Sequence, residues 1–410
     1  MDQHKLYRTI QMLGETKFRT EEQLLAHVLE SIIRNEEIPI RGGRIWKLEP
    51  AGGSYRLLRQ FGDMEPIDAN FRIRVAEYPL FLQLPRKGTL IGRETHPYLL
   101  RKGIKTFSAT GVGERIEWKG YELYQYIIAI TAAYLKRDMT YALNIIGTAL
   151  NAVLKNRRVE SKARLLEADI DKAREIQKSI LPEHELKFHN YDLYGISLPD
   201  RIVGGDFFDY LQAAGDKERL GVVIGDAASK GLSAAAQALY VSGALRMGVE
   251  YQTKIGSLIT RVNTLVHRAF SAEHFVSLVY AELNSSDRGL VIYVNAGHSN
   301  PLILRAGTNE VETIAATGQI IGPFIRETYH SDFTIFGKGD LMLMYTDGIV
   351  EAANEQGEMY GEARLVHTLK QHRKKSPREI CQQILEEVQN FNKMAEYSDD
   401  KTLVAIKRSR

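Results

Sequence analysis

The stretch from Asp340 to Glu351 reads DLMLMYTDGIVE and decides how the C-terminal half of the chain is interpreted. The five residues after Asp340 form an uninterrupted apolar and aromatic run, which is typical of a strand buried on both faces. The run ends at Thr346-Asp347-Gly348, where the glycine permits a sharp turn of the backbone. A carboxylate buried alone is costly, so Asp347 requires a cation, hydrogen-bond donors or open water.

The composition is that of a globular protein of two or three domains. Of the 410 residues, 44% are apolar and 26% are charged, with a net charge of +3. This near balance of charge argues against a nucleic acid as the main partner, and no apolar run is long enough for a membrane span. The N-terminus lacks the apolar core of a secretory signal, and Cys381 is the only cysteine. We therefore expect a cytoplasmic protein in a reducing compartment.

The first 137 residues predict a small α+β domain. A capping-box pattern at Thr20–Gln23 precedes a helix with one apolar face, and Gly42-Gly43 then breaks the chain. Two strands joined by a turn are expected between Ile45 and Phe61, and the apolar run Tyr121–Ile130 predicts a core strand. Between Asp68 and Gly120 we expect loops with two short strands. This order loosely resembles a GAF domain, which implies a regulatory role; an inert dimerising domain is the alternative.

Residues 138–182 predict one long helix that links two domains. From Asp138 to Leu181 the chain has no proline and one glycine, and Pro182 then ends the helix. Two apolar seams fit helical spacing: Leu143, Ile146, Leu150 and Val153, then Val159, Ala163, Leu166, Ile170, Ala173, Gln177 and Ile180. The second seam alternates steps of four and three, which favours a dimeric coiled coil. The alternative is a helix that packs on its own domain.

Residues 183–410 predict two antiparallel sheets with helices outside them. Within this domain, four breaks in the chain carry aspartates: Gly204–Asp209, Gly225-Asp226, Thr346–Gly348 and Ser398–Asp400. Aspartates in such breaks are ordinary turn signals when taken singly. Three of these breaks adjoin an apolar strand, however, and converging carboxylates favour a hard divalent cation such as Mg²⁺ or Mn²⁺. Zinc is disfavoured because no cysteine and histidine ligand spacing accompanies the aspartates.

The segment from Ala173 onward resembles the SpoIIE/RsbU-type branch of the metal-dependent serine/threonine protein phosphatases, the PPM family. Five motifs carry the resemblance in order: VGGDFFDY (203–210), GDAASKGLSAA (225–235), NAGHSNPLIL (295–304), YTDGIVEA (345–352) and SDDKTLVAI (398–406). The resemblance implies an αββα sandwich with two Mn²⁺ or Mg²⁺ ions at one end. The expected class is thus α+β, with an N-terminal GAF-like domain, a connecting helix and a C-terminal PPM-like sandwich.

The resemblance also assigns roles to residues. It implies that Asp226, Asp347 and Asp399 act in catalysis by holding the metal ions and their bound water, and that Asp226 bridges the two ions. The remaining implied roles are metal binding by Asp206 and the Ala227 carbonyl, a supporting role for Asp209, Asp400 as the substitute for Asp399, and phosphate binding by Arg201. We expect His298 to belong to a structural turn.

One motif departs from the family pattern. After Gly225 the family usually reads Asp-Val-Ser-Gly-(His/Lys)-Gly, whereas this chain reads Asp226-Ala-Ala-Ser-Lys-Gly231. A glycine is replaced by Ser229, and a serine is strained wherever the backbone requires a positive φ. We therefore expect activity that is low or conditional if Ser229 occupies such a position.

The sequence thus favours a regulated phosphoserine/phosphothreonine protein phosphatase. By resemblance, its substrate is a phosphorylated anti-sigma-factor antagonist of the STAS type, in bacterial stress signalling that controls a sigma factor. Two alternatives stay open: a PPM-fold module that binds a partner without turnover, and a phosphatase of small phosphoesters. We expect a homodimer joined through the linker helix, with neither nucleic acid nor membrane as partner.

Overall fold

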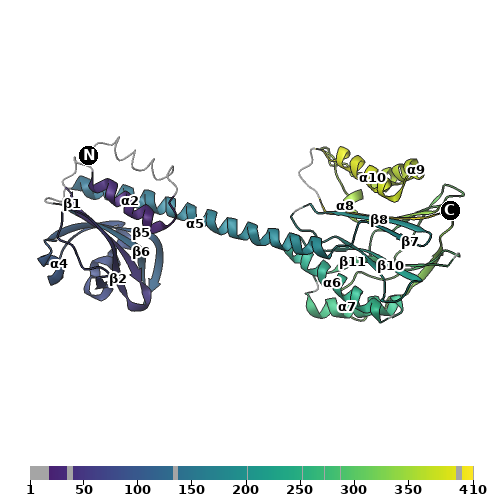
Figure 1. Ribbon diagram of the computed structural model, residues 1–410, viewed down its shortest axis with the longest axis horizontal. Helices are drawn as coiled ribbons and strands as arrows, with labels where there is room; N and C mark the ends of the chain where they lie inside the picture. Colours follow the sequence, from purple (N-terminus) through teal and green to yellow (C-terminus); the bar gives the residue numbers. More distant parts are fainter. Residues whose placement is uncertain are drawn as a thin grey trace. The chain divides into compact units, whose positions relative to one another are not determined.

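The computed structural model describes residues 18–34, 40–132, 137–200, 202–251, 253–271, 273–286, 288–393 and 399–409, with only the backbone for residues 137–139. Contacts divide the chain into two compact units, one up to Leu165 and one from Leu166 onward. Helix α5 (Arg137–Ile180) begins in the first unit and ends in the second (Figure 1). The functional division into 1–137, 138–182 and 183–410 stays a prediction.

The first unit contains one antiparallel sheet of six strands in the order β3-β2-β1-β6-β5-β4. The central pair joins the first strand to the last, because Ile45 of β1 lies opposite Ile128 of β6. The strands are β1 (Ile40–Glu49), β2 (Ser54–Gly62), β3 (Arg72–Arg74), β4 (Thr89–Arg93), β5 (Thr106–Trp118) and β6 (Tyr121–Ala132). Short helical segments between β3 and β5 cover one face: η2 (Val75–Glu77), η3 (Pro79–Gln83), α3 (Leu84–Lys87) and α4 (Pro97–Arg101). This topology does not by itself identify a GAF domain.

Helix α2 (Glu21–Ile33) packs on the other face of this sheet, and its sequence explains both its start and its close approach. The Thr20 side chain accepts a hydrogen bond from the Gln23 amide, so the predicted N-cap is confirmed. The prediction that Gly42-Gly43 breaks the chain is wrong, because both glycines lie inside β1. A Cβ on Gly43 would lie 2.5 Å from Leu29 Cδ1, so the glycine lets α2 rest directly on the strand.

Strand β5 corrects the expectation of loops between Asp68 and Gly120. It runs for 13 residues and pairs with β6 along most of its length. Its small and polar residues hide the strand from a hydrophobic pattern, yet they are what the packing requires. A Cβ on Gly111 would lie only 1.9 Å from the Tyr124 ring of β6, so no larger residue fits there.

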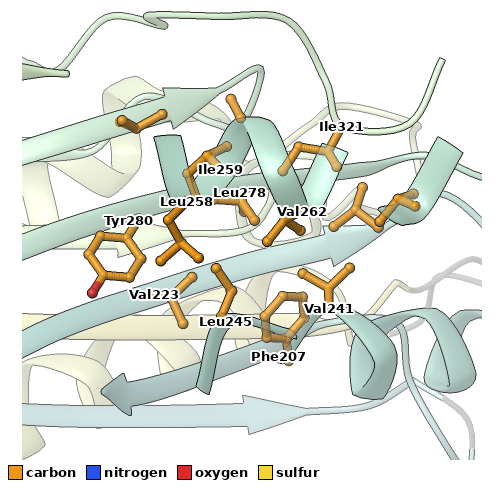
Figure 2. Close-up of a cluster of buried hydrophobic side chains, with 14 of the residues drawn as sticks. Phe207, Val223, Val241, Leu245, Leu258, Ile259, Val262, Leu278, Tyr280 and Ile321 are labelled. Atoms are coloured by element: carbon orange, nitrogen blue, oxygen red, sulfur yellow. The ribbon is translucent and has the colours of Figure 1, made fainter. Parts of the chain in front are cut away.

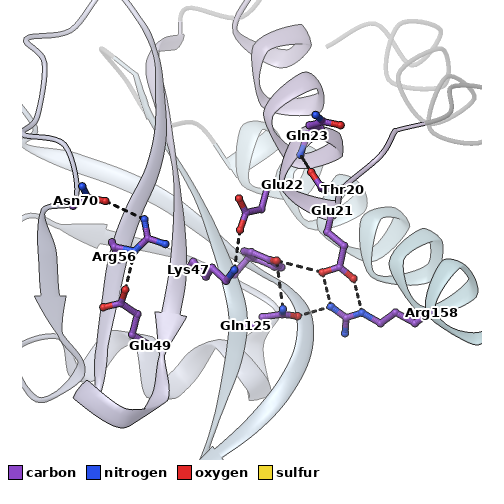
Figure 3. Close-up of polar contacts among 11 residues, drawn as sticks. Thr20, Glu21, Glu22, Gln23, Lys47, Glu49, Arg56, Asn70, Gln125 and Arg158 are labelled. Carbon is purple, nitrogen blue, oxygen red and sulfur yellow. Dashed lines mark hydrogen bonds and ion pairs between the residues drawn. The ribbon is translucent and has the colours of Figure 1, made fainter. Parts of the chain in front are cut away.

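The first seam of α5 is part of the core of its own unit. Leu143, Ile146 and Leu150 are buried with α2 and with the sheet, so the alternative of a helix packed on its own domain holds for this half. Arg158 then fixes the helix by donating two hydrogen bonds to the Glu21 carboxylate, at 2.5 and 2.7 Å, and a third to Gln125 of β6 (Figure 3). The basic cluster that interrupts the two seams thus contacts the first unit.

The second seam is largely exposed. Val159 is 60% exposed and Leu166 is 62% exposed, and both stand in a helix whose surroundings are charged. Gln177, the polar member of this seam, is buried instead. The predicted coiled coil therefore stays a prediction. Its support is the apolar stripe around Val159 and Leu166, which no described residue covers.

The second unit is a sandwich of two antiparallel sheets, as predicted. One sheet has the order β15-β12-β11-β10-β9 and the other β14-β13-β16-β17-β8-β7. The strands of the first sheet are β9 (Phe207–Leu211), β10 (Arg219–Ala227), β11 (Val276–Asn284), β12 (Leu290–Ala296) and β15 (Asp332–Ile335). Those of the second are β7 (Glu185–Phe188), β8 (Tyr191–Leu198), β13 (Leu302–Leu304), β14 (Val311–Thr313), β16 (Leu341–Tyr345) and β17 (Lys401–Arg408).

Helices cover the outer face of each sheet (Figure 1). Helices α6 (Leu232–Glu250) and α7 (Ile255–Ala269) bury Val241, Leu245 and Val262 against the five-stranded sheet, as Figure 2 shows. Helices α9 (Gly361–His372) and α10 (Pro377–Phe391) cover the six-stranded sheet, and a capping box formed by Ser376 and Glu379 begins α10. In the described part of the chain, no helix is long and apolar enough to cross a membrane.

Candidate active site

The predicted acidic residues gather at one end of the sandwich, between the two sheets. In β10, Val222 and Ile224 point into the space between the sheets, and strand alternation places Asp226 on the same side. In β16, Met342 and Met344 point into that space, and the next position on this side is Thr346. Strand β16 ends at Tyr345, opposite Leu403 near the start of β17, so Asp347 and Asp400 leave the same edge. Buried strands therefore deliver these side chains from both sheets.

Asp206 enters this end of the sandwich from the loop before β9. It is only 4% exposed, and its Oδ2 accepts a hydrogen bond of 2.7 Å from Thr346 Oγ1. Thr346 is fully buried, and its hydroxyl oxygen also accepts a hydrogen bond from the Thr402 amide at 3.0 Å. One threonine thus joins the end of β16, the start of β17 and the carboxylate of Asp206.

The electrostatics show that these carboxylates crowd one another. Burial, followed by the charges of Asp347 and Asp399, raises the pKa of Asp226 to about 7. Burial and then the charge of Asp226 raise the pKa of Asp206 well above its usual value. The pKa of Asp347 is raised by burial and by the charge of Asp399. Mutual repulsion of this kind makes a cation favourable at the centre of the group.

Asp347 lies at the start of a short helical turn, α8 (Asp347–Val350), and its neighbour Gly348 explains how it fits. The expected role of Gly348 was to permit a sharp turn, but its φ is not positive. A Cβ there would lie 2.0 Å from the Asp400 carbonyl oxygen, so the glycine allows the two loops to touch. Lys230 Nζ lies 3.7 Å from Oδ2 of Asp399, the residue before Asp400.

The acidic side chains are not yet oriented as a complete set of metal ligands. Within the described ranges, no three histidine, cysteine, aspartate or glutamate side chains are arranged so that they could hold a metal ion. The electrostatic coupling nevertheless links Asp226 to Asp206, Asp347 and Asp399. Oxygen donors of this type and number fit Mg²⁺ or Mn²⁺ after side-chain adjustment.

Asp400, the predicted substitute for Asp399, makes hydrogen bonds to the loop before β9. Its Oδ2 accepts hydrogen bonds from the amides of Gly205 at 2.6 Å and Asp206 at 3.4 Å, and its Oδ1 accepts one from Asp200 at 2.8 Å. The loop reaches it closely only because Gly204 has no side chain, since a Cβ there would lie 2.4 Å from Asp400 Oδ2. Asp400 therefore holds the loop that carries Asp206.

Asp209 faces away from the acidic group. It lies between Phe207 and Leu211 on β9, whose side chains pack toward α6, and it is only 2% exposed. Its carboxylate accepts hydrogen bonds from Arg246 Nε at 2.6 Å and from Ser242 Oγ at 3.2 Å. Arg246 also donates to the carbonyl of Ile180 at 2.6 Å. Asp209 thus orients an arginine that binds the end of α5.

The loop that departs from the family pattern is free of the expected strain. Ser229 is not among the residues with positive φ, whereas Gly231, two residues later, has a φ of 66°. The Ser229 amide donates a hydrogen bond of 2.6 Å to the Ala227 carbonyl, the predicted metal ligand. The Ser229 hydroxyl accepts one from Gln237 Nε2 at 3.1 Å. Serine is compatible with this backbone, and it ties the loop to α6.

Two further predicted residues, Arg201 and His298, and the helix residue His267 have simple outcomes. Arg201 lies outside the described residues. His298 is 6% exposed, its Nδ1 lies 2.8 Å from Ser277 Oγ, and burial lowers its pKa to about 4. It is therefore neutral near pH 7, which agrees with a structural role. His267 Nδ1 lies 2.7 Å from the Gly322 carbonyl oxygen at the end of α7.

Gln177 is the functional candidate that the sequence interpretation missed. Its Nε2 donates to the Gly204 carbonyl at 2.7 Å, and its Oε1 accepts from the Gly204 amide at 3.3 Å. The end of α5 therefore grips the loop that carries Asp206. The available signal was a polar residue at a seam position that is otherwise apolar. Thr346 was also missed, although it stands directly beside Asp347 in the quoted stretch.

Comparisons with known proteins agree with this geometry. Residues 216–409 match the family model of Stage II sporulation protein E (SpoIIE). Phosphoserine phosphatase RsbU of Bacillus subtilis is 23% identical over 243 residues, which cover 59% of this chain and 71% of RsbU. Protein IcfG of Synechocystis is 25% identical over 268 residues, which cover 59% of this chain but only 42% of IcfG.

A solved structure shows the same fold. The SiaA-PP2C domain of Pseudomonas aeruginosa superposes with a TM-score of 0.53 at 18% identity, covering 60% of this chain and 98% of that domain. Its match to the sandwich agrees with the order of the sheets and helices described above. Residues 216–409 are therefore similar to the SpoIIE family, and the sandwich has the fold of a PP2C domain.

Proposed function

We propose that the protein is a regulated, metal-dependent phosphatase of phosphoserine and phosphothreonine in proteins. The observation that carries the proposal is the group formed by Asp206, Asp226, Asp347 and Asp399 at one end of the sandwich, where burial and neighbouring carboxylates raise the pKa of Asp206, Asp226 and Asp347. Such a group is unfavourable on its own and becomes favourable around divalent cations. The name of RsbU, a phosphoserine phosphatase, supports the same reaction.

The metal ions are proposed to be two, Mn²⁺ or Mg²⁺. Asp226 would hold both ions, as the resemblance implies, and the charges of Asp347 and Asp399 both raise its pKa. Asp347, Asp399, Asp206 and the Ala227 carbonyl are the proposed remaining ligands. Bound ions of this kind lower the pKa of water and neutralise charge that develops on a phosphoryl group.

The surrounding residues hold this group in place. Thr346 fixes the Asp206 carboxylate by hydrogen bonding, and Asp400 binds the amides of the loop before it. Lys230 stands beside Asp399 and offers a positive charge at the rim. Because the proposal assigns these carboxylates to metal binding, the chain positions the phosphate and a water that attacks it, and the proposed reaction has no covalent intermediate with the chain.

The proposed substrate is a phosphorylated STAS-domain antagonist of an anti-sigma factor, in partner-switching signalling in the cytoplasm. The name of RsbU, a phosphoserine phosphatase, supports a phosphoserine substrate, and the STAS domain is what the resemblance of the sequence implies. Phosphate release should be measured with a phosphorylated STAS protein, a phosphoserine peptide and p-nitrophenyl phosphate, while Mn²⁺ is titrated. We expect faster turnover on the phosphoprotein than on the small ester.

The variant that tests the site is Asp347→Ala. It removes a proposed ligand, so metal-dependent phosphate release should be lost, whereas Asp332→Ala on the exposed strand β15 should retain it. If the wild-type chain binds the phosphoprotein but releases no phosphate at saturating Mn²⁺, the module that binds without turnover is the correct function. Equal or better turnover on p-nitrophenyl phosphate would favour a phosphatase of small phosphoesters.

Regulation is proposed to reach the site through α5. The support lies in two contacts inside the second unit: Gln177 binds both backbone groups of Gly204, and Arg246 binds the Ile180 carbonyl. We propose that residues 1–137 form a GAF-like sensor domain and that residues 138–182 link it to the phosphatase domain at 183–410. The exposed apolar stripe around Val159 and Leu166 supports a homodimer that pairs these helices as a coiled coil.

A further inference from the structure

A large basic groove lies on the second unit, away from the acidic group. It has a volume of about 870 Å³ and is lined by eight lysine or arginine residues and two acidic residues. The lining is therefore more positive than the whole chain, whose net charge is +3. Nothing in the proposed reaction uses this groove.

The groove and the acidic group lie at opposite ends of the same strands. Leu341 lines the groove at the start of β16 and pairs with Lys407, whereas Tyr345, at the other end, pairs with Leu403 next to the acidic residues. Four residues along a strand span about 13 Å. A molecule in the groove is thus separated from the acidic group by the length of the strand, so it does not occupy the place of the phosphate.

The groove combines a charged rim with an apolar floor. The half-buried Leu186 and the exposed Ala306 offer apolar surface to the groove, whereas Leu304, Leu341 and Tyr194 line it as buried residues of the outer sheet face. Exposed basic side chains surround this floor: Lys187, Lys338, Lys374 and Arg378. A ligand that fills the groove must offer both negative charge and apolar side chains.

One wall of the groove is held in a fixed position. Lys407 Nζ of β17 donates to the carbonyls of Arg373 at 2.9 Å and Lys375 at 2.7 Å, in the segment between α9 and α10. The Ser376–Glu379 capping box then fixes the start of α10 immediately after this segment. Because the backbone is tied down on both sides, Lys374 and Arg378 project from a preformed surface.

We propose that this groove is a docking site for an acidic, partly apolar segment of a partner protein. Charge complementarity favours an acidic ligand, and the apolar floor favours a peptide chain with occasional large side chains. A single-stranded nucleic acid fits less well, because Tyr194 is the one aromatic side chain in the lining and it is buried, so stacked bases have no platform. A lipid surface fits less well, because the groove is concave.

The test uses the full chain and a fluorescein-labelled 15-residue peptide that alternates short glutamate runs with leucine and phenylalanine. Fluorescence anisotropy at low salt measures its dissociation constant. Binding should weaken steeply with added salt, because the exposed charges are screened. A peptide with glutamine in place of each glutamate should bind at least tenfold more weakly.

Charge reversal locates the site. The triple variant Lys338→Glu, Lys374→Glu and Arg378→Glu should weaken peptide binding at least tenfold. The matched control reverses three exposed basic residues at α7, on the other side of the sandwich: Lys254→Glu, Arg261→Glu and Arg268→Glu. The control should bind within twofold of the wild type. Both variants should keep the wild-type melting temperature and turnover of p-nitrophenyl phosphate, which separates this proposal from the proposed reaction.

Three results would overturn the proposal. The first is no binding of the acidic peptide to the wild type at low salt, and the second is equal binding to the triple variant and the control. The third is that labelled oligo-dT of 15 nucleotides, or vesicles containing phosphatidylserine, bind the groove more tightly than the peptide. If the triple variant loses its fold, the single change Lys374→Glu in the exposed segment before α10 replaces it, with an expected loss of at least threefold.

Discussion

At the acidic end of the sandwich, several glycines are required because other atoms lie too close for a side chain. Gly204, Gly205 and Gly348 all lie where an added Cβ would be within 3 Å of another backbone or carboxylate atom. None of the three has a positive φ, so close approach explains them and backbone conformation does not. In the Asp347-Gly348 motif the glycine thus lets two loops touch, and the aspartate lies at their contact.

Gly204→Ala should test this requirement. The new methyl group would lie 2.4 Å from Asp400 Oδ2, so the loop must move and carry Asp206 with it. A displacement of about 1 Å in a catalytic group can cost roughly 100-fold in rate, so we expect a loss of that order in metal-dependent turnover. Steady-state phosphate release at several Mn²⁺ concentrations measures it.

The matched control is Gly243→Ala in α6. No atom lies within 4 Å of the added Cβ, and the site is helical, so the change should leave turnover intact. It should stabilise the domain by about 0.5–1 kcal/mol, since alanine favours a helix more than glycine does. If Gly204→Ala keeps wild-type turnover, Asp400 does not control the position of Asp206.

At the scale of elements, sequence pattern identified what is buried and periodic. The run LMLMY appears as β16, and the capping pattern at Thr20 begins α2. The sequence pattern did not identify strand β5, because its glycines and its residues with hydroxyl side chains give no apolar signal. The position of β5 depends on a close fit to Tyr124 of β6. The hydrophobic pattern of one segment does not show how closely it fits the strand with which it pairs.

The candidate site shows the same limit. The sequence pointed to Asp226, Asp347 and Asp399 because each stands where an apolar run meets a break, and to Asp206 through the resemblance of its motif. It could not separate Asp399 from Asp400, since only the folded loop shows that Asp400 binds the Gly205 amide. It gave Asp209 a supporting role, and only the folded strand β9 shows that this residue points toward Arg246.

Gln177→Ala tests the contact between α5 and the site loop. The change leaves the buried Gly204 amide and carbonyl without their side-chain partner, which costs about 1–3 kcal/mol when unsatisfied groups stay buried. We expect turnover to fall by about tenfold and the Mn²⁺ concentration for half-maximal activity to rise, because the Asp206 loop loses a support.

Lys178→Ala, on the exposed side of the same turn, is the control and should behave as the wild type. A metal titration distinguishes the two explanations for any loss. A lower melting temperature with an unchanged metal requirement would mean that Gln177 only stabilises the domain.

At the scale of the whole molecule, the effect of the end of α5 on phosphatase activity can be measured with fragments that begin on either side of it. The second unit begins at Leu166, within α5, so it includes Gln177 and Ile180. A fragment of residues 166–410 keeps both contacts, whereas a fragment of residues 183–410 keeps every strand of the sandwich but loses them. The pair of fragments isolates what the end of the helix contributes to the phosphatase domain.

We expect the 166–410 fragment to release phosphate at a rate within a few-fold of the full chain, and the 183–410 fragment to be about tenfold slower with a higher Mn²⁺ requirement. The reason is that Arg246 and Gly204 lose their α5 partners only in the shorter fragment. The 166–410 fragment with Gln177→Ala should fall between the two, because it lacks one contact and keeps the other. Sedimentation of the full chain and both fragments should place any dimer in those that retain the exposed seam. Equal turnover and metal requirement in the 183–410 fragment and the full chain would show that α5 does not act on the site.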